Sequence, residues 1–209
     1  GDQIAGCTID QAALALEQLA RLQGPRWGER ALLDYPLLQG ITQDPGKMQA
    51  MYLSLQDGFL NRFGSRLGEN YTKLVPQVGA FLTRYHDKYT GKPCLIHKDY
   101  RLDNMMFGGA RAITVVDWQS LTLGCPLLDV SYFLGTSLAL EDRRQEERHL
   151  LRHYLSTLKH YGIDMSENAC FDLYRNYAPA GLVTALFGAM LVEETCLLYT
   201  SDAADEWIG

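Results

Sequence analysis

The sequence predicts an α+β fold that is mostly helical and has a small β insert near the middle of the chain. Two observations lead to this prediction. Apolar residues recur at helical spacing over most of the chain, and three short apolar runs divided by polar turns lie between residues 94 and 116. The length of 209 residues, with 47% hydrophobic and 21% charged residues, is ordinary for one globular domain. This composition excludes a disordered tail and a low-complexity array.

The first half of the chain predicts helices. One helix is expected from Thr8 to Gln23, because Thr8 can cap it, Gln11 stands in capping-box register, and an apolar face follows. Gly24 and Pro25 end this helix. Residues 35–46 read as irregular chain, and apolar stripes predict two more helices, over 48–63 and 71–89.

From residue 91 onward, short strand-like runs replace the helical spacing of apolar residues. Three strand-like runs, at 94–96, 105–107 and 113–116, predict a small sheet that carries loops. Helices are expected again after the insert, over 126–140, 141–161 and 171–194, with a break in the last one near residues 179–181.

Charge and cysteine content narrow the function classes. The net charge is −6 and no basic cluster occurs, which excludes a general nucleic-acid binder. The longest weakly polar stretch, residues 178–192, is shorter than the roughly 20 residues that span a bilayer, so no membrane span is expected. The five cysteines are scattered and show no zinc spacing. We therefore expect a reduced, cytoplasmic setting, and no oligomeric state follows from the sequence.

The residues that carry chemistry gather in and after the insert. Residues 97–104 read HKDYRLDN, and Asp117 ends the third strand-like run thirteen residues after Asn104. An aspartate on a loop, such as Asp99, can accept or orient the hydroxyl proton of a phosphoryl acceptor. An asparagine oxygen and a second carboxylate can hold Mg²⁺ on nucleotide phosphates, since hard oxygen ligands suit this ion. Read as structure alone, Asp99 and Asp117 would be a turn residue and a strand-end cap.

These motifs resemble the carboxy-terminal lobe of the aminoglycoside phosphotransferase and choline kinase-like family, which includes many bacterial phosphotransferase family proteins. The HGDxxxxN loop of that family matches residues 97–104, and its hydrophobic-hydrophobic-Asp-[Trp/Phe]-[Gln/Glu] segment matches residues 115–119. Its Gly-x-Pro-x-x-Asp segment matches residues 124–129. The resemblance implies a protein-kinase-like fold, in which the β insert carries the catalytic and metal loops.

The resemblance also implies roles for single residues. Asp99 would be catalytic, Asn104 and Asp117 would bind Mg²⁺, and His97 and Asp129 would be structural support. The reaction would transfer the γ-phosphoryl group of ATP, or of GTP, to a hydroxyl of a small molecule. The family usually has glycine after the histidine, and here the residue is Lys98. The lysine could add positive charge near the phosphates or point to solvent.

The nucleotide-gripping amino-terminal lobe of such kinases has no counterpart in the sequence, so no residue is assigned to nucleotide binding. We expect residues 1–195 to be the carboxy-terminal lobe and residues 196–209, which resemble a translated sequencing adapter, to be non-native. Such a fragment would be inactive or nearly so, because positioning and electrostatics dominate this chemistry. The alternatives are an enzyme that phosphorylates protein side chains and a kinase-like binding or scaffold module without transfer.

Overall fold

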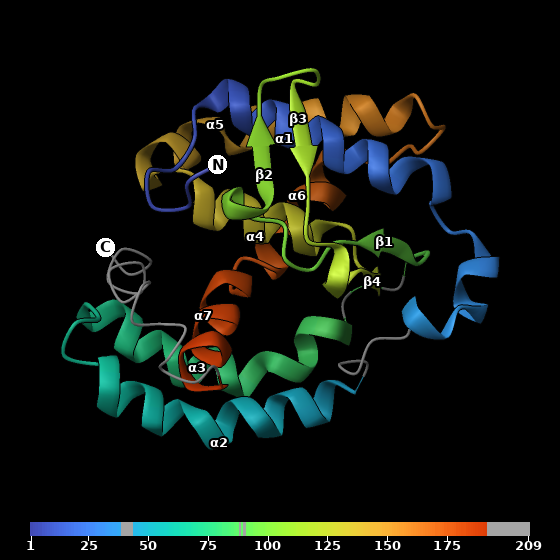
Figure 1. The fold of residues 1–209 in the computed structure, drawn as a ribbon. Helices are drawn as coiled ribbons and strands as arrows, with labels where there is room; N and C mark the ends of the chain where they lie inside the picture. The colour runs from blue at the N-terminus through green and yellow to red at the C-terminus, as the bar shows by residue number, and fades with distance from the viewer. Residues whose placement is uncertain (39–43, 88, 90, 192–209) are drawn as a thin grey trace. The chain divides into compact units, whose positions relative to one another are not determined.

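The computed structural model describes residues 1–38, 44–87, 89 and 91–191 (Figure 1). The chain forms two compact units, of which unit 1 comprises residues 1–40 and 89–178, and unit 2 comprises residues 41–88 and 179–209. The tail predicted over 196–209 lies outside the described residues, so both parts of the expected domain division remain predictions.

Unit 1 combines helices with two small sheets. Its helices are α1 (Ile9–Gln23), α4 (Leu127–Ser137), α5 (Leu140–Lys159) and α6 (Glu167–Asn176). Its strands are β1 (Cys94–Ile96), β2 (Met105–Phe107), β3 (Ile113–Val115) and β4 (Thr122–Gly124). Single 3₁₀ turns connect them, at η1 (Gly24–Arg26), η2 (Arg30–Asp34), η3 (Pro36–Leu38), η4 (Leu102–Asn104) and η5 (Trp118–Ser120).

Helix α1 begins with the predicted capping box. The Thr8 hydroxyl accepts a hydrogen bond from the Gln11 amide at 3.2 Å, and the Gln11 side chain accepts one from the Thr8 amide at 3.0 Å. Both bonds satisfy backbone donors that a helix start leaves unpaired. The buried face of α1 packs along α5 and consists of small and leucine side chains, namely Ala12, Ala15, Leu16, Leu19 and Ala20. The predicted helix is therefore confirmed, and its face forms part of the core of unit 1.

The three predicted strands form, but they pair in two separate antiparallel sheets (Figure 1). Strand β2 pairs with β3 through a turn in which Gly108 and Gly109 have φ angles of +87° and +84°. Strand β1 pairs with β4, which the sequence did not predict. Strand β4 has three residues and ends in glycine, so it shows no apolar–polar alternation from which a strand could be predicted. It is recognised only by its pairing with β1.

Unit 2 contains α2 (Pro45–Phe63), α3 (Glu69–Asp87) and α7 (Ala180–Leu191). The break predicted near residues 179–181 is confirmed, because α6 ends at Asn176 and α7 begins at Ala180. The Tyr52 hydroxyl donates to the Val75 carbonyl at 3.0 Å and joins α2 to α3. The core of unit 2 is apolar and consists of Tyr52, Phe59, Phe63, Leu67, Val75, Val78, Leu82, Val183 and Leu186.

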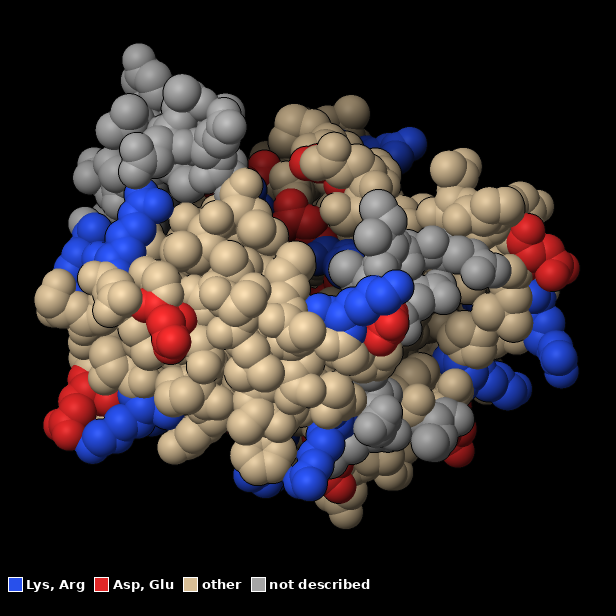
Figure 2. All heavy atoms as spheres, turned by 90° about the horizontal axis from the view of Figure 1, so that it is seen from below, with Lys and Arg blue, Asp and Glu red and all other residues tan. Residues whose placement is uncertain are grey.

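The surface of unit 2 also exposes large apolar side chains, including Met51, Leu53, Tyr71, Leu74 and Phe81. Met51 precedes the buried Tyr52 in α2, and it is 40% exposed. Figure 2 shows a broad uncharged area that is bordered by both basic and acidic side chains. In the described part of the chain, no helix combines the length and apolarity that a membrane crossing requires.

Candidate active site

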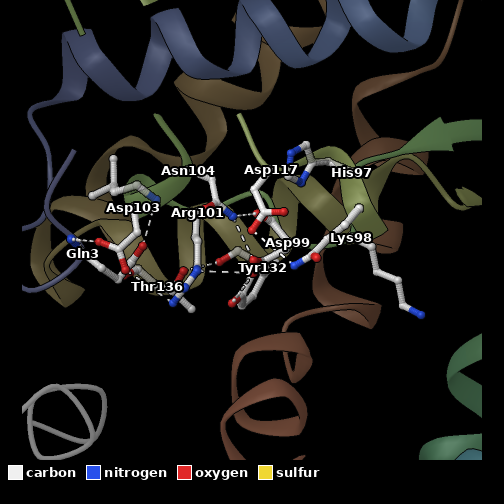
Figure 3. Close-up of polar contacts among 12 residues, drawn as sticks. Gln3, His97, Lys98, Asp99, Arg101, Asp103, Asn104, Asp117, Tyr132 and Thr136 are labelled. Carbon is white, nitrogen blue, oxygen red and sulfur yellow. Dashed lines mark hydrogen bonds and ion pairs between the residues drawn. The ribbon is translucent and has the colours of Figure 1, made fainter. Parts of the chain in front are cut away.

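The ends of short strands bring the predicted site residues together. His97, Lys98 and Asp99 follow directly on β1, Asn104 immediately precedes β2, and Asp117 comes shortly after β3. Pairing of β2 with β3 continues one step beyond the hairpin, because the Val116 amide donates to the Asn104 carbonyl at 2.9 Å. This bond holds the chain before Asp117 against Asn104. Figure 3 shows Asp99, Asn104 and Asp117 in one cluster.

Asn104 binds Asp99 through both hydrogens of its side-chain amide. Its Nδ2 donates to the carboxylate Oδ2 of Asp99 and to the main-chain carbonyl of Asp99, each at 2.8 Å. Asn104 is buried, so these bonds replace ones that the amide would make to water. The remaining polar atom of the amide is its oxygen, Oδ1, which is an acceptor and a suitable ligand for a hard cation.

The second carboxylate oxygen of Asp99 has weaker partners. The Tyr132 hydroxyl lies 3.4 Å from Oδ1, and the Arg101 Nε lies 3.4 Å from the same atom. These separations are at the long end of hydrogen-bond distances. The Asp99 side chain is 28% exposed. One carboxylate oxygen is thus firmly held, and the other keeps acceptor capacity at a partly open surface.

Asp117 is an exposed residue with an unusual backbone conformation. Its φ angle is +60°, in the left-handed region, where a non-glycine residue costs on the order of 1–2 kcal/mol. This conformation ends the extended chain and starts the turn η5. The Gln119 side-chain amide approaches the Asp117 carboxylate at 3.4 Å. Such strain in an isolated residue is often found at functional sites.

His97 is fully buried beneath the site. Its Nε2 lies 3.0 Å from the Val116 carbonyl, so Nε2 carries the proton in the tautomer that this bond requires. The Trp118 ring lies against the imidazole, with ring centres 4.9 Å apart. The imidazole thereby contacts the backbone just before Asp117.

Asp129 lies inside the unit at the start of α4 and is fully buried. Its two carboxylate oxygens accept the backbone amides of His97 and Lys98, at 2.6 Å and 2.8 Å. Burial raises the pKa of Asp129 to about 7, and the two amide hydrogen bonds oppose this rise. The carboxylate thus spans the two residues that precede Asp99.

Lys98 occupies the position at which the resembling family has glycine, and its φ angle is +68°. Glycine reaches this left-handed region without steric cost, which is a physical reason for glycine there. Burial lowers the pKa of the Lys98 ammonium group.

Two residues of this cluster were not singled out as site residues from the sequence. Tyr132 follows Asp129 by three positions in α4, and this spacing puts both side chains on one face of a helix. That spacing was an available signal. Gln3 bonds to the loop between Asp99 and Asn104 from about 100 positions away, and no local pattern could indicate it.

Comparison with known proteins decides the family. The model of the ecdysteroid kinase-like family matches residues 48–165, which is more than half of the chain and includes Asp99, Asn104 and Asp117. The chain belongs to the ecdysteroid kinase-like family. This is a protein-kinase-like phosphotransferase family, and the mostly helical fold with small antiparallel sheets is compatible with it. The finer resemblance to aminoglycoside phosphotransferases and choline kinases stays a prediction.

Two curated relatives match a shorter stretch. Acyl-CoA dehydrogenase family member 11 of Rattus norvegicus is 36% identical over 60 residues, and the protein of the same name from Mus musculus is 33% identical over 60 residues. Each match covers 28% of this chain and 8% of the relative. The chain therefore corresponds to a small part of those proteins. No solved structure matches.

Proposed function

We propose that this member of the ecdysteroid kinase-like family transfers the γ-phosphoryl group of ATP, or of GTP, to a hydroxyl of a small molecule in an Mg²⁺-dependent reaction. One observation carries the proposal. The Asn104 amide fixes one oxygen of Asp99 at 2.8 Å, the second oxygen has only partners at 3.4 Å, and the Asp99 side chain is 28% exposed. Family membership supports phosphotransferase chemistry in general.

The side chains offered to a metal suit Mg²⁺. The amide oxygen of Asn104 and the exposed carboxylate of Asp117 are hard oxygen donors. No group of three or more His, Cys, Asp or Glu side chains in the described part of the chain could hold a metal by itself. Mg²⁺ commonly takes one or two protein ligands and completes its shell with substrate phosphates and water. Two ligands at this site therefore fit a metal that arrives with a nucleotide.

In the proposed reaction, the acceptor hydroxyl approaches Asp99 Oδ1 and passes its proton to that carboxylate as the hydroxyl oxygen bonds to the γ-phosphorus. The bond between the γ-phosphorus and the β,γ-bridging oxygen breaks, and the nucleoside diphosphate leaves with that oxygen. Asn104 holds one oxygen of the carboxylate through its hydrogen bond to Oδ2, and its second hydrogen bond ties it to the main-chain carbonyl of Asp99. Bound Mg²⁺ would neutralise negative charge on the nucleotide phosphates. In this proposal Asp99 is therefore the general base, and Asn104 and Asp117 are the metal ligands.

His97 and Asp129 have supporting roles in this proposal. Asp129 pairs with the amides of His97 and Lys98, directly before the base, and His97 binds the Val116 carbonyl, directly before Asp117. Together they connect the loop that holds the base to the loop that holds the metal ligand. Neither residue needs to touch a substrate.

The acceptor is proposed only as a class. The family description names ecdysteroid, so ecdysteroid alcohols join aminoglycosides, other sugars, amino alcohols and lipid-like alcohols as acceptors to be screened. Fold alone does not select among them, because substrate pockets vary on a shared scaffold.

The experiment is an acceptor screen with the complete product of the gene, ATP and Mg²⁺, in which ADP release and the phosphorylated product are measured. Asp99→Ala should abolish transfer and leave the unfolding transition nearly unchanged. Asp172→Ala, at an exposed position in α6, is the matched control and should keep full turnover. Retained turnover in Asp99→Ala would contradict the role of Asp99. Nucleotide binding without transfer to any acceptor would instead favour the scaffold module.

A further inference from the structure

A series of polar contacts leads from the backbone of Gln3, in the amino-terminal segment, to the proposed base (Figure 3). The backbone amide of Gln3 donates to Asp103 Oδ1 at 3.1 Å, and Asp103 Oδ2 lies 3.4 Å from Arg101 Nη1. Arg101 Nε in turn lies 3.4 Å from Asp99 Oδ1. We call Gln3, Asp103 and Arg101 together the Gln3–Asp103–Arg101 network. It reaches the Asp99 oxygen that Asn104 does not hold.

Gln3 is firmly attached at the start of this network. It is 8% exposed, and its Oε1 accepts the Leu102 amide at 2.8 Å. Its Nε2 donates to the Thr136 carbonyl in α4. Gln3 therefore contacts the η4 turn and α4 at once, and its backbone amide can direct Asp103 from a rigid base.

Arg101 is held between two carboxylates, those of Asp99 and Asp103. Its Nε is buried and makes no hydrogen bond to a described atom, and Asp99 Oδ1 is the carboxylate oxygen paired with it. The guanidinium group is planar and rigid, so fixing one edge of it through Asp103 also fixes the edge that faces Asp99. These ion pairs are partly exposed, and such pairs contribute little to stability. Their effect is therefore expected on geometry.

We propose that Arg101 is a positioning residue that sets the orientation of the Asp99 carboxylate, and that Gln3 and Asp103 hold Arg101 in place. The proposal deepens the proposed function and rests on it for the role of Asp99. Asn104 restrains one oxygen of the carboxylate, and the guanidinium restrains the other. Without the second restraint the carboxylate rotates, and a misplaced base loses rate while substrate binding is kept.

The kinetic test compares variants of the complete gene product. Arg101→Ala should lower kcat about 10- to 100-fold, with KM for the nucleotide changed by less than about twofold. Added guanidinium ion should restore part of the lost kcat, which a purely structural defect would not allow. Arg101→Lys keeps the positive charge but lacks the planar guanidinium group, so its kcat should fall less than that of Arg101→Ala. Gln3→Ala should also lower kcat, with KM for the nucleotide nearly unchanged. Arg152→Ala, which removes a surface ion pair to Glu167 at 3.7 Å, is the matched control and should leave kcat unchanged.

A second readout does not depend on turnover. In the carbon-13 spectrum, the carboxyl signal of Asp99 is identified by its loss in Asp99→Asn. Arg101→Ala and Gln3→Ala should both move this signal, and Arg152→Ala should not. An unmoved signal in folded Arg101→Ala and Arg101→Lys would overturn the proposal, as would unchanged kcat in both. If the signal moves while the wild-type protein transfers no phosphoryl group, the proposed function fails and the positioning of Asp99 by Arg101 stands.

Discussion

Asn104 donates its side-chain amide to both the carboxylate and the main-chain carbonyl of Asp99, at 2.8 Å each. The η4 turn between the two residues makes this possible, because it returns the chain toward Asp99 within five positions. The spacing of the motif HKDYRLDN is therefore the spacing that closes this pair. These bonds use the nitrogen of the Asn104 side-chain amide, and its oxygen, Oδ1, remains as the acceptor of that group.

The Asn104–Asp99 pair leads to a prediction about metal. Asn104→Asp would place two carboxylates in contact at neutral pH, and their repulsion should lower the free energy of unfolding by about 1–3 kcal/mol. Added Mn²⁺ should raise the thermal unfolding midpoint of this variant more than that of the wild type, since a bound cation stabilises the folded state and offsets the repulsion. Calorimetry with and without MnCl₂ measures both effects. An equal response in the two proteins would speak against Asn104 as a metal-facing residue.

Lys98 has a left-handed backbone at φ +68°, and this predicts an unusual response to glycine. Lys98→Gly should leave stability unchanged or raise it by up to about 1 kcal/mol, because relief of the left-handed strain offsets the entropy that glycine adds to the unfolded chain. Lys98→Val should be clearly destabilising, because a β-branched residue is strained there.

The matched control for Lys98→Gly is Lys73→Gly in the helix α3. Glycine in a helix interior should cost about 1 kcal/mol. Urea unfolding of the three variants distinguishes the two positions. A loss at Lys98→Gly equal to that at Lys73→Gly would show that position 98 has no special backbone requirement.

Asp129 accepts two backbone amides from inside the unit, which predicts that its amide variant is poorly tolerated. Asp129→Asn would turn a side-chain NH₂ group toward one of those two donors. The unpaired, buried donors should cost about 2–3 kcal/mol of unfolding free energy. Asp172→Asn, at an exposed helix position, should change stability by less than about 0.5 kcal/mol. Chemical denaturation of both variants provides the comparison.

The raised pKa of Asp129 also predicts a pH dependence. Burial raises the pKa of the folded state to about 7 from an ordinary value near 3.8, so the folded protein binds this proton more tightly than the unfolded chain does. The contribution of this group to stability is full below pH 3.8 and is lost as the pH rises toward 7. This component of the free energy of unfolding of the wild type should therefore decrease as the pH is raised from 5 to 8. The component should be absent in Asp129→Asn, and an identical slope in both proteins would show that another group is responsible.

The capping box of α1 predicts a smaller effect near the amino terminus. Thr8→Ala removes the bond to the Gln11 amide and should cost about 1 kcal/mol of unfolding free energy. Thr8→Ser keeps the hydroxyl and should cost far less. Thermal unfolding of the pair separates capping from the loss of the methyl group. If the serine variant is as unstable as the alanine variant, the cap is not the cause.

The sequence alone was sufficient for features that depend on nearby residues. The capping box at Thr8, the break before Ala180 and the runs that became β1, β2 and β3 are all local patterns. Asp99, Asn104 and Asp117 could be named as candidates from a motif, because phosphoryl transfer requires particular residue types near strand ends, and their roles stay predictions. Hydrogen-bond and periodicity rules act over a few positions, and these features lie within that range.

Only the tertiary structure decided which distant residues meet. The sequence could not show that β1 pairs with β4, because three residues ending in Gly124 carry no strand pattern of their own. It also could not show that Lys98 takes a left-handed backbone under Asp129, or that Gln3 holds the loop of Asp99 from about 100 positions away. Each of these contacts exists because folding buries the partners together. Their free energy comes from packing and desolvation, which depend on neighbours in space rather than in sequence.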